Sequence, residues 1–213
     1  MKKSTSIILI VSFSLVLFSC AGTFKQKSSF PGIPYSANGF KTQGTTIGFI
    51  TPSSSYGLEQ DKWILLKILS DTIKKRNGVT IVSPNKCLSL INRARLAKQC
   101  TEMIRGHIIS GILEKETLSK IGRVIGVNYF LHLRLTGFDQ SVHTRFSLFS
   151  LRLINSQQAK MRASIQIWEA KNGVIVWESQ VENIISIEAL RARPVSFERI
   201  AKLICEKFTS ELP

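Results

Sequence analysis

Beyond Gly126 the chain alternates apolar and polar residues, and this period of two constrains the fold more than any other feature. In the stretch VNYFLHLRL, the apolar residues on one side are Val127, Tyr129, Leu131, Leu133 and Leu135. The stretches RFSLFSLRLI, KMRASIQIWEA and GVIVWESQV continue the pattern, with a slip near Phe149 that indicates a bulge. Such alternation is typical of strands with one buried face. The sequence therefore predicts an antiparallel meander, with a hairpin at Asn172-Gly173 and His143 in an earlier turn.

Amphipathic helices are predicted on both sides of this meander. The apolar stripe of the first consists of Ile64, Leu65, Ile68, Leu69, Thr72 and Ile73. One or two short helices follow Pro84, another ends at the C-cap residue Gly126, and the last begins after the N-cap residue Ser196. Short strands are expected at Thr46–Ile50 and over VTIVSP. The fold class is therefore α+β, a mixed and largely antiparallel sheet with helices packed on it.

The N-terminus has the plan of a secretory leader. Lys2 and Lys3 precede an apolar run that is shorter than the ~20 residues a membrane-spanning helix needs. The tetrapeptide LFSC, which ends at Cys20, resembles the bacterial lipobox. This resemblance implies that residues 1–19 are a lipoprotein signal peptide and that Cys20 is lipidated and becomes the N-terminus. Ala21 resembles the pattern that permits sorting to the outer membrane; the alternative is an ordinary leader with a chance cysteine.

The rest of the chain is expected to form a short tether and one domain. Residues 20–44 are rich in Ser, Gly, Lys and Pro without an apolar period, which predicts a flexible tether, and residues 45–213 are expected to form a single periplasmic domain. Removal of Lys2 and Lys3 lowers the net charge from +15 to +13. For an exported lipoprotein this charge favours anionic lipid head groups or cell-wall polymers over nucleic acid as partners. A proteome that is basic throughout would explain it equally.

Three cysteines remain once Cys20 is assigned to the lipid. Cys205 lies on the apolar stripe of the last helix and is expected in the core, whereas Cys87 and Cys100 either form a disulfide or remain thiols. Their spacing alone does not decide between these alternatives. No CxxC or Cys/His cluster has the spacing of a metal site, so no metal or cofactor is expected.

The sequence contains no convincing catalytic constellation. Ser83 and Lys86 have the S-x-x-K spacing of serine acyl-transferases, but no S-D-N or uninterrupted K-T-G follows. His107, His132 and His143 have no acid and nucleophile at a useful spacing, so each is expected at the surface or at an edge. Trp168 and Trp177 flank the predicted hairpin, where such residues either pack across strands or contact a partner.

Two stretches resemble the periplasmic domain of CsgG-like lipoproteins, whose wider relatives include LpoB-type activators of penicillin-binding proteins and the N-terminal domain of TolB. From Ile121 to Leu131 the chain is similar to that family's helix, turn and strand, with GVN in place of a Gly-Ala-Asp-like turn. From Trp168 to Trp177 it is similar to a TGEVVW-like hairpin, with KNGVIVW here. The likeness extends from about Thr45 to Leu212. It implies the α+β fold and brings no catalytic residues.

These observations predict a lipid-anchored, non-enzymatic module on the periplasmic face of the outer membrane. Such a module would bind another envelope protein or support envelope assembly, and self-association into a homo-oligomer stays open. The alternative is an oligomeric secretion-channel component of the outer membrane, for which Thr144 to Ala170 is the candidate insertion. A cell-wall hydrolase or acyl-transferase is the third hypothesis.

Overall fold

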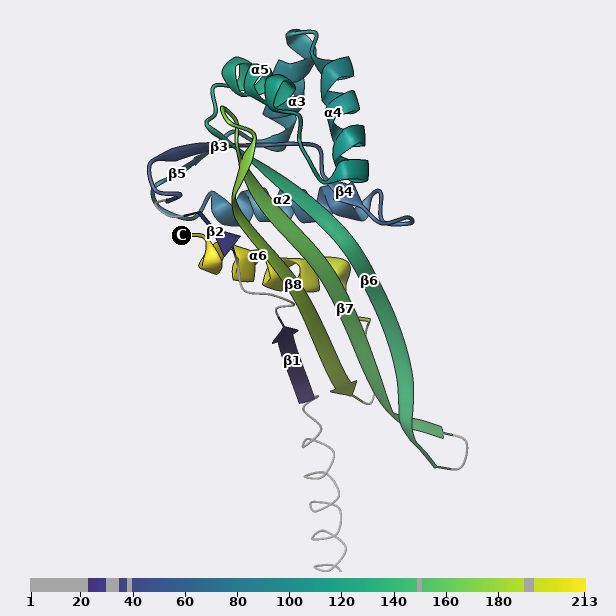
Figure 1. Ribbon diagram of the computed structural model, residues 1–213. Coiled ribbons are helices and arrows are strands. Elements are labelled where there is room, and N and C mark those ends of the chain that lie inside the picture. The colour runs from purple at the N-terminus through teal and green to yellow at the C-terminus, as the bar shows by residue number, and fades with distance from the viewer. Residues whose placement is uncertain (1–22, 30–34, 38–39, 149–150, 190–193) are drawn as a thin grey trace, which may run out of the picture.

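The computed structural model describes residues 23–29, 35–37, 40–148, 151–189 and 194–213 (Figure 1). Its elements in chain order are β1 (Thr23–Ser29), β2 (Tyr35–Ser36), β3 (Thr45–Phe49), β4 (Ser53–Ser54), α2 (Asp61–Ile73), β5 (Val79–Ile81), α3 (Pro84–Arg93), α4 (Ala97–Ser110), α5 (Lys115–Ile125), β6 (Tyr129–Leu148), β7 (Leu151–Glu169), β8 (Val174–Ala189) and α6 (Phe197–Glu211). The signal peptide and Cys20 lie outside the described residues. No helix in the described part of the chain is long and apolar enough to cross a membrane.

All of these strands belong to one mixed sheet, and its main path has the order β1-β8-β7-β6-β3-β5. β3 runs parallel to both β5 and β6, whereas β6, β7, β8 and β1 are mutually antiparallel neighbours. β2 adds to β8, and β4 adds to β6. Helices pack on this sheet from both sides, so the predicted α+β class is confirmed (Figure 1).

The meander strands are longer than their sequence patterns predict. β6 has 20 residues, β7 has 19 and β8 has 16. The stretch RFSLFSLRLI is not a separate strand, because β6 ends within it at Leu148 and β7 begins within it at Leu151. Phe149 lies outside the described residues. His143 is not in a turn but pairs with Ser156 inside the hairpin. The sequence pattern places the turn wrongly because two alternating runs joined by a short turn look continuous.

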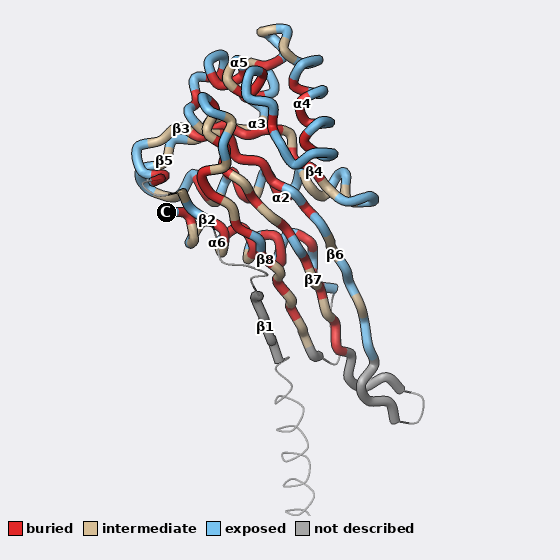
Figure 2. Tube along the Cα trace, in the orientation of Figure 1, coloured by how far each residue is buried: buried red, intermediate tan, exposed pale blue. Residues whose placement is uncertain are grey.

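One face of the meander is apolar and is covered by α2 and α6 (Figures 1 and 2). The two helices contact each other and the strands, and Leu65, Leu69 and Phe208 are completely buried between these layers. Cys205 is buried in this core, as predicted, and its Sγ lies 3.8 Å from the carbonyl oxygen of Leu65. The periodic stripes of both helices thus face the alternating apolar side of the sheet.

A second, smaller core lies on the opposite face, where α3, α4 and α5 cover only the end of the sheet near Tyr129 (Figure 1). Cys87 and Cys100 both lie in this core. Both are free thiols, so the structure shows no disulfide between them. The Cys87 Sγ instead lies 3.4 Å from the amide nitrogen of Phe49 and 3.4 Å from the carbonyl oxygen of Val82. Burial raises the pKa of both thiols.

Two strands, β1 and β2, lie within the range for which the sequence predicts a tether. β1 pairs along β8, from Thr23 opposite Glu188 to Ser29 opposite Glu182, and β2 pairs with the start of β8. Phe40 is buried with its ring centroid 5.1 Å from that of Tyr129. An edge strand needs only one hydrogen-bonded neighbour, so a Lys- and Ser-rich segment without an apolar period can still form one.

Gly122 fixes how closely α5 approaches the sheet. A Cβ at this position would lie 2.8 Å from the Cβ of Ala170 and 3.2 Å from the carbonyl oxygen of Val127. Gly126, four residues later, ends the helix in the left-handed conformation with φ 76°, as the C-cap prediction requires. Gly122 therefore allows close packing and Gly126 caps the helix.

We predict that Gly122→Ala lowers the free energy of unfolding by about 1–3 kcal/mol, because the added methyl group overpacks a rigid contact. The matched control is Gly106→Ala in α4, where an added Cβ meets nothing within 4 Å. That substitution should raise stability by about 0.5–1 kcal/mol through helix propensity. Urea unfolding followed by circular dichroism measures both, and equal effects would contradict the close approach at Gly122.

Candidate functional site on the open face of the sheet

The meander has a second face that is polar, and among the described residues helices cover it only at the end where α3, α4 and α5 pack. Its side chains alternate with the buried apolar residues of β6, β7 and β8. We call this surface the open polar face and define it by His132, Arg134, Thr136, Arg162, Ser164, Gln166, Glu178, Gln180 and Glu182. Antiparallel sheets tolerate such a face because water satisfies one side while the other packs on the core.

Two adjoining hollows form a groove along the open polar face. The first has a volume of about 410 Å³ and lies between the C-terminal end of α4, β4 and the meander. The second has a volume of about 520 Å³ and lies further along the same strands. Arg134, Ser164 and Gln180 line both hollows, so the two hollows form one continuous groove. These three side chains present a charged group, a hydroxyl and an amide to it.

A buried pair of histidines forms the inner end of this groove. The Nε2 atom of His107 on α4 lies 3.2 Å from the Nδ1 atom of His132 on β6, and the rings meet edge to face. The His107 ring also packs against Trp168, with 5.8 Å between ring centroids. Both histidines are buried, which corrects the prediction that they lie at the surface or at an edge. The two histidines are 25 positions apart in the sequence, so local sequence patterns do not reveal this contact.

Burial keeps both imidazoles neutral. It lowers the pKa of His132 to about 3, with a further decrease from His107 and from Arg134. Burial also lowers the pKa of His107, against the backbone of Gly111, which raises it. Only one proton lies between the two rings, and the outer nitrogens, Nδ1 of His107 and Nε2 of His132, have no hydrogen-bond partner among the described protein atoms. The pair therefore leaves one buried donor and one buried acceptor without a partner among the described protein atoms.

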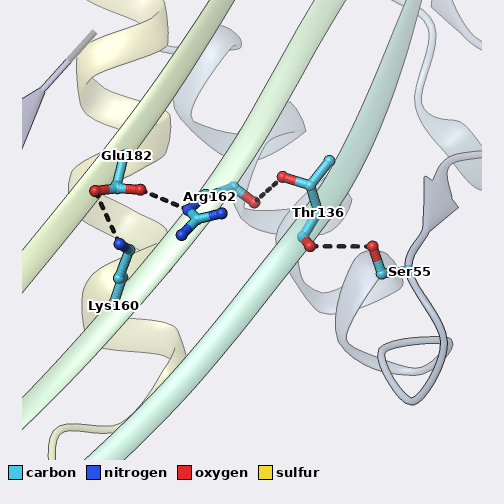
Figure 3. Close-up of polar contacts among 5 residues, drawn as sticks. All are labelled: Ser55, Thr136, Lys160, Arg162 and Glu182. Carbon is cyan, nitrogen blue, oxygen red and sulfur yellow. Dashed lines mark hydrogen bonds and ion pairs between the residues drawn. The ribbon is translucent and has the colours of Figure 1, made fainter. Parts of the chain in front are cut away.

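An ion-pair network stabilises the outer part of the groove (Figure 3). Glu182 on β8 accepts from Arg162 at 2.5 Å and pairs with Lys160 at 3.1 Å. Burial tends to raise the pKa of Glu182, but the hydrogen bonds and charges of Lys160 and Arg162 outweigh it and hold the pKa below its usual value. The carboxylate is therefore ionised at neutral pH, and the network fixes β7 against β8 on this face.

A bulge in β6 at Thr136 is held by hydrogen bonds to its neighbours (Figure 3). The register shifts between Leu135 and Gly137, and the Thr136 hydroxyl donates to the carbonyl oxygen of Arg162 at 3.2 Å. The Ser55 hydroxyl donates to the carbonyl oxygen of Thr136 at 3.0 Å. These bonds attach the loop after β4 to the open polar face.

Exposed isoleucines border the groove at the C-terminal end of α4. Ile108 is 64% exposed, Ile109 83% and Ile112 65%. We call these residues the isoleucine patch. Ile108 and Ile109 line the first hollow, whereas Ile112 lines a separate hollow between α4 and α5. Such a cluster of large apolar side chains on a surface is characteristic of an interaction site. The apolar run HIISGIL was visible in the sequence, but its exposure was not.

The other residues singled out in the sequence have structural roles. Ser83 is the N-cap of α3 and accepts from the amide of Lys86, so this hydroxyl caps a helix. Trp168 and Trp177 are 3% and 1% exposed and lie in different cores. Neither is available to a partner, which corrects that alternative and agrees with packing across strands. Among the described residues, no three His, Cys, Asp or Glu side chains could jointly hold a metal ion.

Comparison with known proteins gives a fold likeness and no family. No protein-family model matches the chain, and no curated protein matches it in sequence. The PelC dodecamer from Paraburkholderia phytofirmans is 12% identical, covering 90% of this chain and 96% of that chain with a TM-score of 0.41. Lipoprotein GNA1162 from Neisseria meningitidis is 11% identical, covering 78% and 99% with a TM-score of 0.42.

The C-terminal domain of LpoB from Salmonella enterica is also similar. It is 16% identical, covering 68% of this chain and 86% of that chain with a TM-score of 0.36. The solved structures that resemble this chain thus include bacterial lipoproteins, among them the LpoB type to which the sequence shows a resemblance. At TM-scores below 0.5 the likeness is approximate.

The histidine pair predicts a pH dependence of stability. The folded-state pKa values of His107 and His132 are depressed, so the unfolded chain binds more protons once the pH falls below about 6.5. Stability is therefore complete above this pH and falls as the pH decreases towards 3, by up to about 1.4 kcal/mol per pH unit for each histidine.

This dependence is measured by urea unfolding at pH 7.5 and pH 5.5, a window above the ordinary pKa of carboxylates. His132→Gln should reduce the difference between the two pH values. His143→Gln is the matched control, because His143 is exposed on β6 and should leave the difference unchanged. An unchanged difference in His132→Gln would show that the buried pair does not govern the transition.

Proposed function

We propose that this protein is a lipid-anchored module of the bacterial cell envelope that binds another envelope protein. The observation that carries the proposal is the isoleucine patch beside the groove of the open polar face. Protein interfaces combine an apolar centre, which supplies most of the binding energy, with polar groups that fix the orientation. This surface offers both within one region of a basic chain, and it needs no cofactor or nucleic acid.

The location is proposed on the lipobox resemblance at Cys20. One acyl chain binds a membrane only marginally, whereas two or more attach a protein durably. Lipidation would hold the domain at the membrane, and the residue after Cys20 supports the periplasmic face of the outer membrane. The leader and the lipid thus determine which partners the isoleucine patch can meet.

Lipidation predicts a specific mass for the N-terminal peptide. We expect mass spectrometry of membrane-purified protein to show that residues 1–19 are absent and that Cys20 carries a diacylglyceryl group. Cys20→Ser should leave the leader in place, because the thiol is the atom that the lipid modifies. Ala21→Ser is a control that retains the thiol. An unmodified, uncleaved Cys20 in the wild-type protein would contradict the proposal.

Partner binding is tested by photo-crosslinking in cells. A photoreactive amino acid at Ile109 should give a discrete crosslinked product with another envelope protein, whereas one at Lys62 on α2 should not. Ile112→Ser in the Ile109-labelled protein should reduce the product severalfold, because apolar contacts at an interface centre contribute strongly. Equal products at both positions, or none at Ile109, would refute the isoleucine patch as the binding surface.

An oligomeric secretion component is the second candidate, and the length of β6 and β7 favours it. The candidate insertion, Thr144 to Ala170, contains the end of β6 and all of β7, and these two strands extend well beyond the helices (Figure 1). Sedimentation of the detergent-solubilised lipoprotein distinguishes the candidates. A monomer supports the binding module, whereas a single ring-sized species supports the secretion component.

A further inference from the structure

We infer that the end of the sheet where β1 begins lies against the membrane that holds the lipid anchor, and that its basic residues contact anionic lipid head groups there. This inference rests on the proposed lipidation of Cys20. It adds a second, direct contact between the folded domain and the bilayer. It also fixes the orientation of the groove and the isoleucine patch, because α4 and β4 border the groove and lie towards the other end of the sheet (Figure 1).

The first step is the short reach from the lipid to the sheet. Thr23, the first residue of β1, is three residues after Cys20. Three residues span at most about 10 Å even when fully extended. Thr23 pairs with Glu188, one residue before β8 ends at Ala189. A lipid on Cys20 would therefore hold this corner of the sheet within about 10 Å of the bilayer surface.

The second step is that the β6–β7 hairpin extends past this corner. Glu188 pairs with Ser156 on β7, and Ser156 pairs with His143 on β6. β6 continues for five residues beyond His143, to Leu148, which is about 17 Å at the usual rise of a strand. This distance exceeds the reach of the anchor, so the anchor cannot hold the hairpin clear of the bilayer. β6 is the third strand across the sheet from β1, so at the usual distance between neighbouring strands the two are only about 15 Å apart.

The third step is the charge at this end of the chain. No Asp or Glu occurs between Gln140 and Trp168, or anywhere before Glu59. From the level of Lys25 outward, the paired strands contain one acid, Glu188, against Lys25, Arg145 and Arg152. Such basic clusters are attracted to anionic lipid within a Debye length of the surface.

The test measures which end of the domain lies at the bilayer. The mature lipoprotein is reconstituted into vesicles that contain brominated phosphatidylcholine, with a fluorophore on His143→Cys or on the matched control Lys98→Cys. Both positions are exposed, and Lys98 lies on α4 beyond the opposite end of β6. His143 is about 46 Å along β6 from Tyr129, the residue at which the strand begins. Cys87, Cys100 and Cys205 are buried and should resist labelling of the folded protein.

We expect brominated lipid to quench the label at position 143 at least twice as strongly as the label at position 98. Including phosphatidylglycerol should increase quenching at 143, and 1 M salt should reverse the increase. Arg145→Gln with Arg152→Gln should also remove the increase, whereas Lys62→Gln with Lys67→Gln on α2 should not.

Equal quenching at both positions, or stronger quenching at 98, would overturn the orientation. A phosphatidylglycerol response that survives the arginine substitutions would overturn the assignment of the head-group contact to the hairpin. Mass spectrometry of the same samples separates the two proposals. Lipidated Cys20 with equal quenching refutes this inference alone, whereas unmodified Cys20 refutes the proposed function and this inference with it.

Discussion

The packing of α2 and α6 on one face of the long meander is the interaction on which the rest of the structure depends. Both helices carry one apolar stripe, and the strands offer one apolar side, so burial of these surfaces fixes the register of every strand in the meander. If the register of β6 shifted by one residue, its leucines would face water and His132 and Arg134 would face the core. The same constraint leaves the opposite face polar.

The open polar face and its groove follow from this division of the sheet. α4 covers only one end of that face, and where it ends, it brings His107 against His132 and leaves the isoleucine patch exposed. The smaller core of α3, α4 and α5 thus positions the candidate site rather than enclosing it. Binding between proteins suits an open groove with an apolar border better than chemistry on an enclosed substrate does.

Much of the fold could be predicted because its signals are local and periodic. The alternation of β6, the stripes of α2 and α6, the cap at Gly126 and the N-cap at Ser196 are all found in the structure. The hairpin between β6 and β7 was misplaced because alternating residues continue on both sides of its turn. β1 was missed because an edge strand is held by backbone hydrogen bonds to β8, which composition does not indicate.

The sequence by itself determined the α+β class, the buried faces of the main helices and strands, and the basic charge, because each depends on residue type and near-neighbour spacing. Only the tertiary structure decided that His107 meets His132, that Cys87 and Cys100 are free, and that Trp168 and Trp177 are buried. It also decided that three isoleucines are exposed and that the segment after Cys20 joins the sheet. Each of these depends on which segments, distant along the chain, the packing of helices on the sheet brings together.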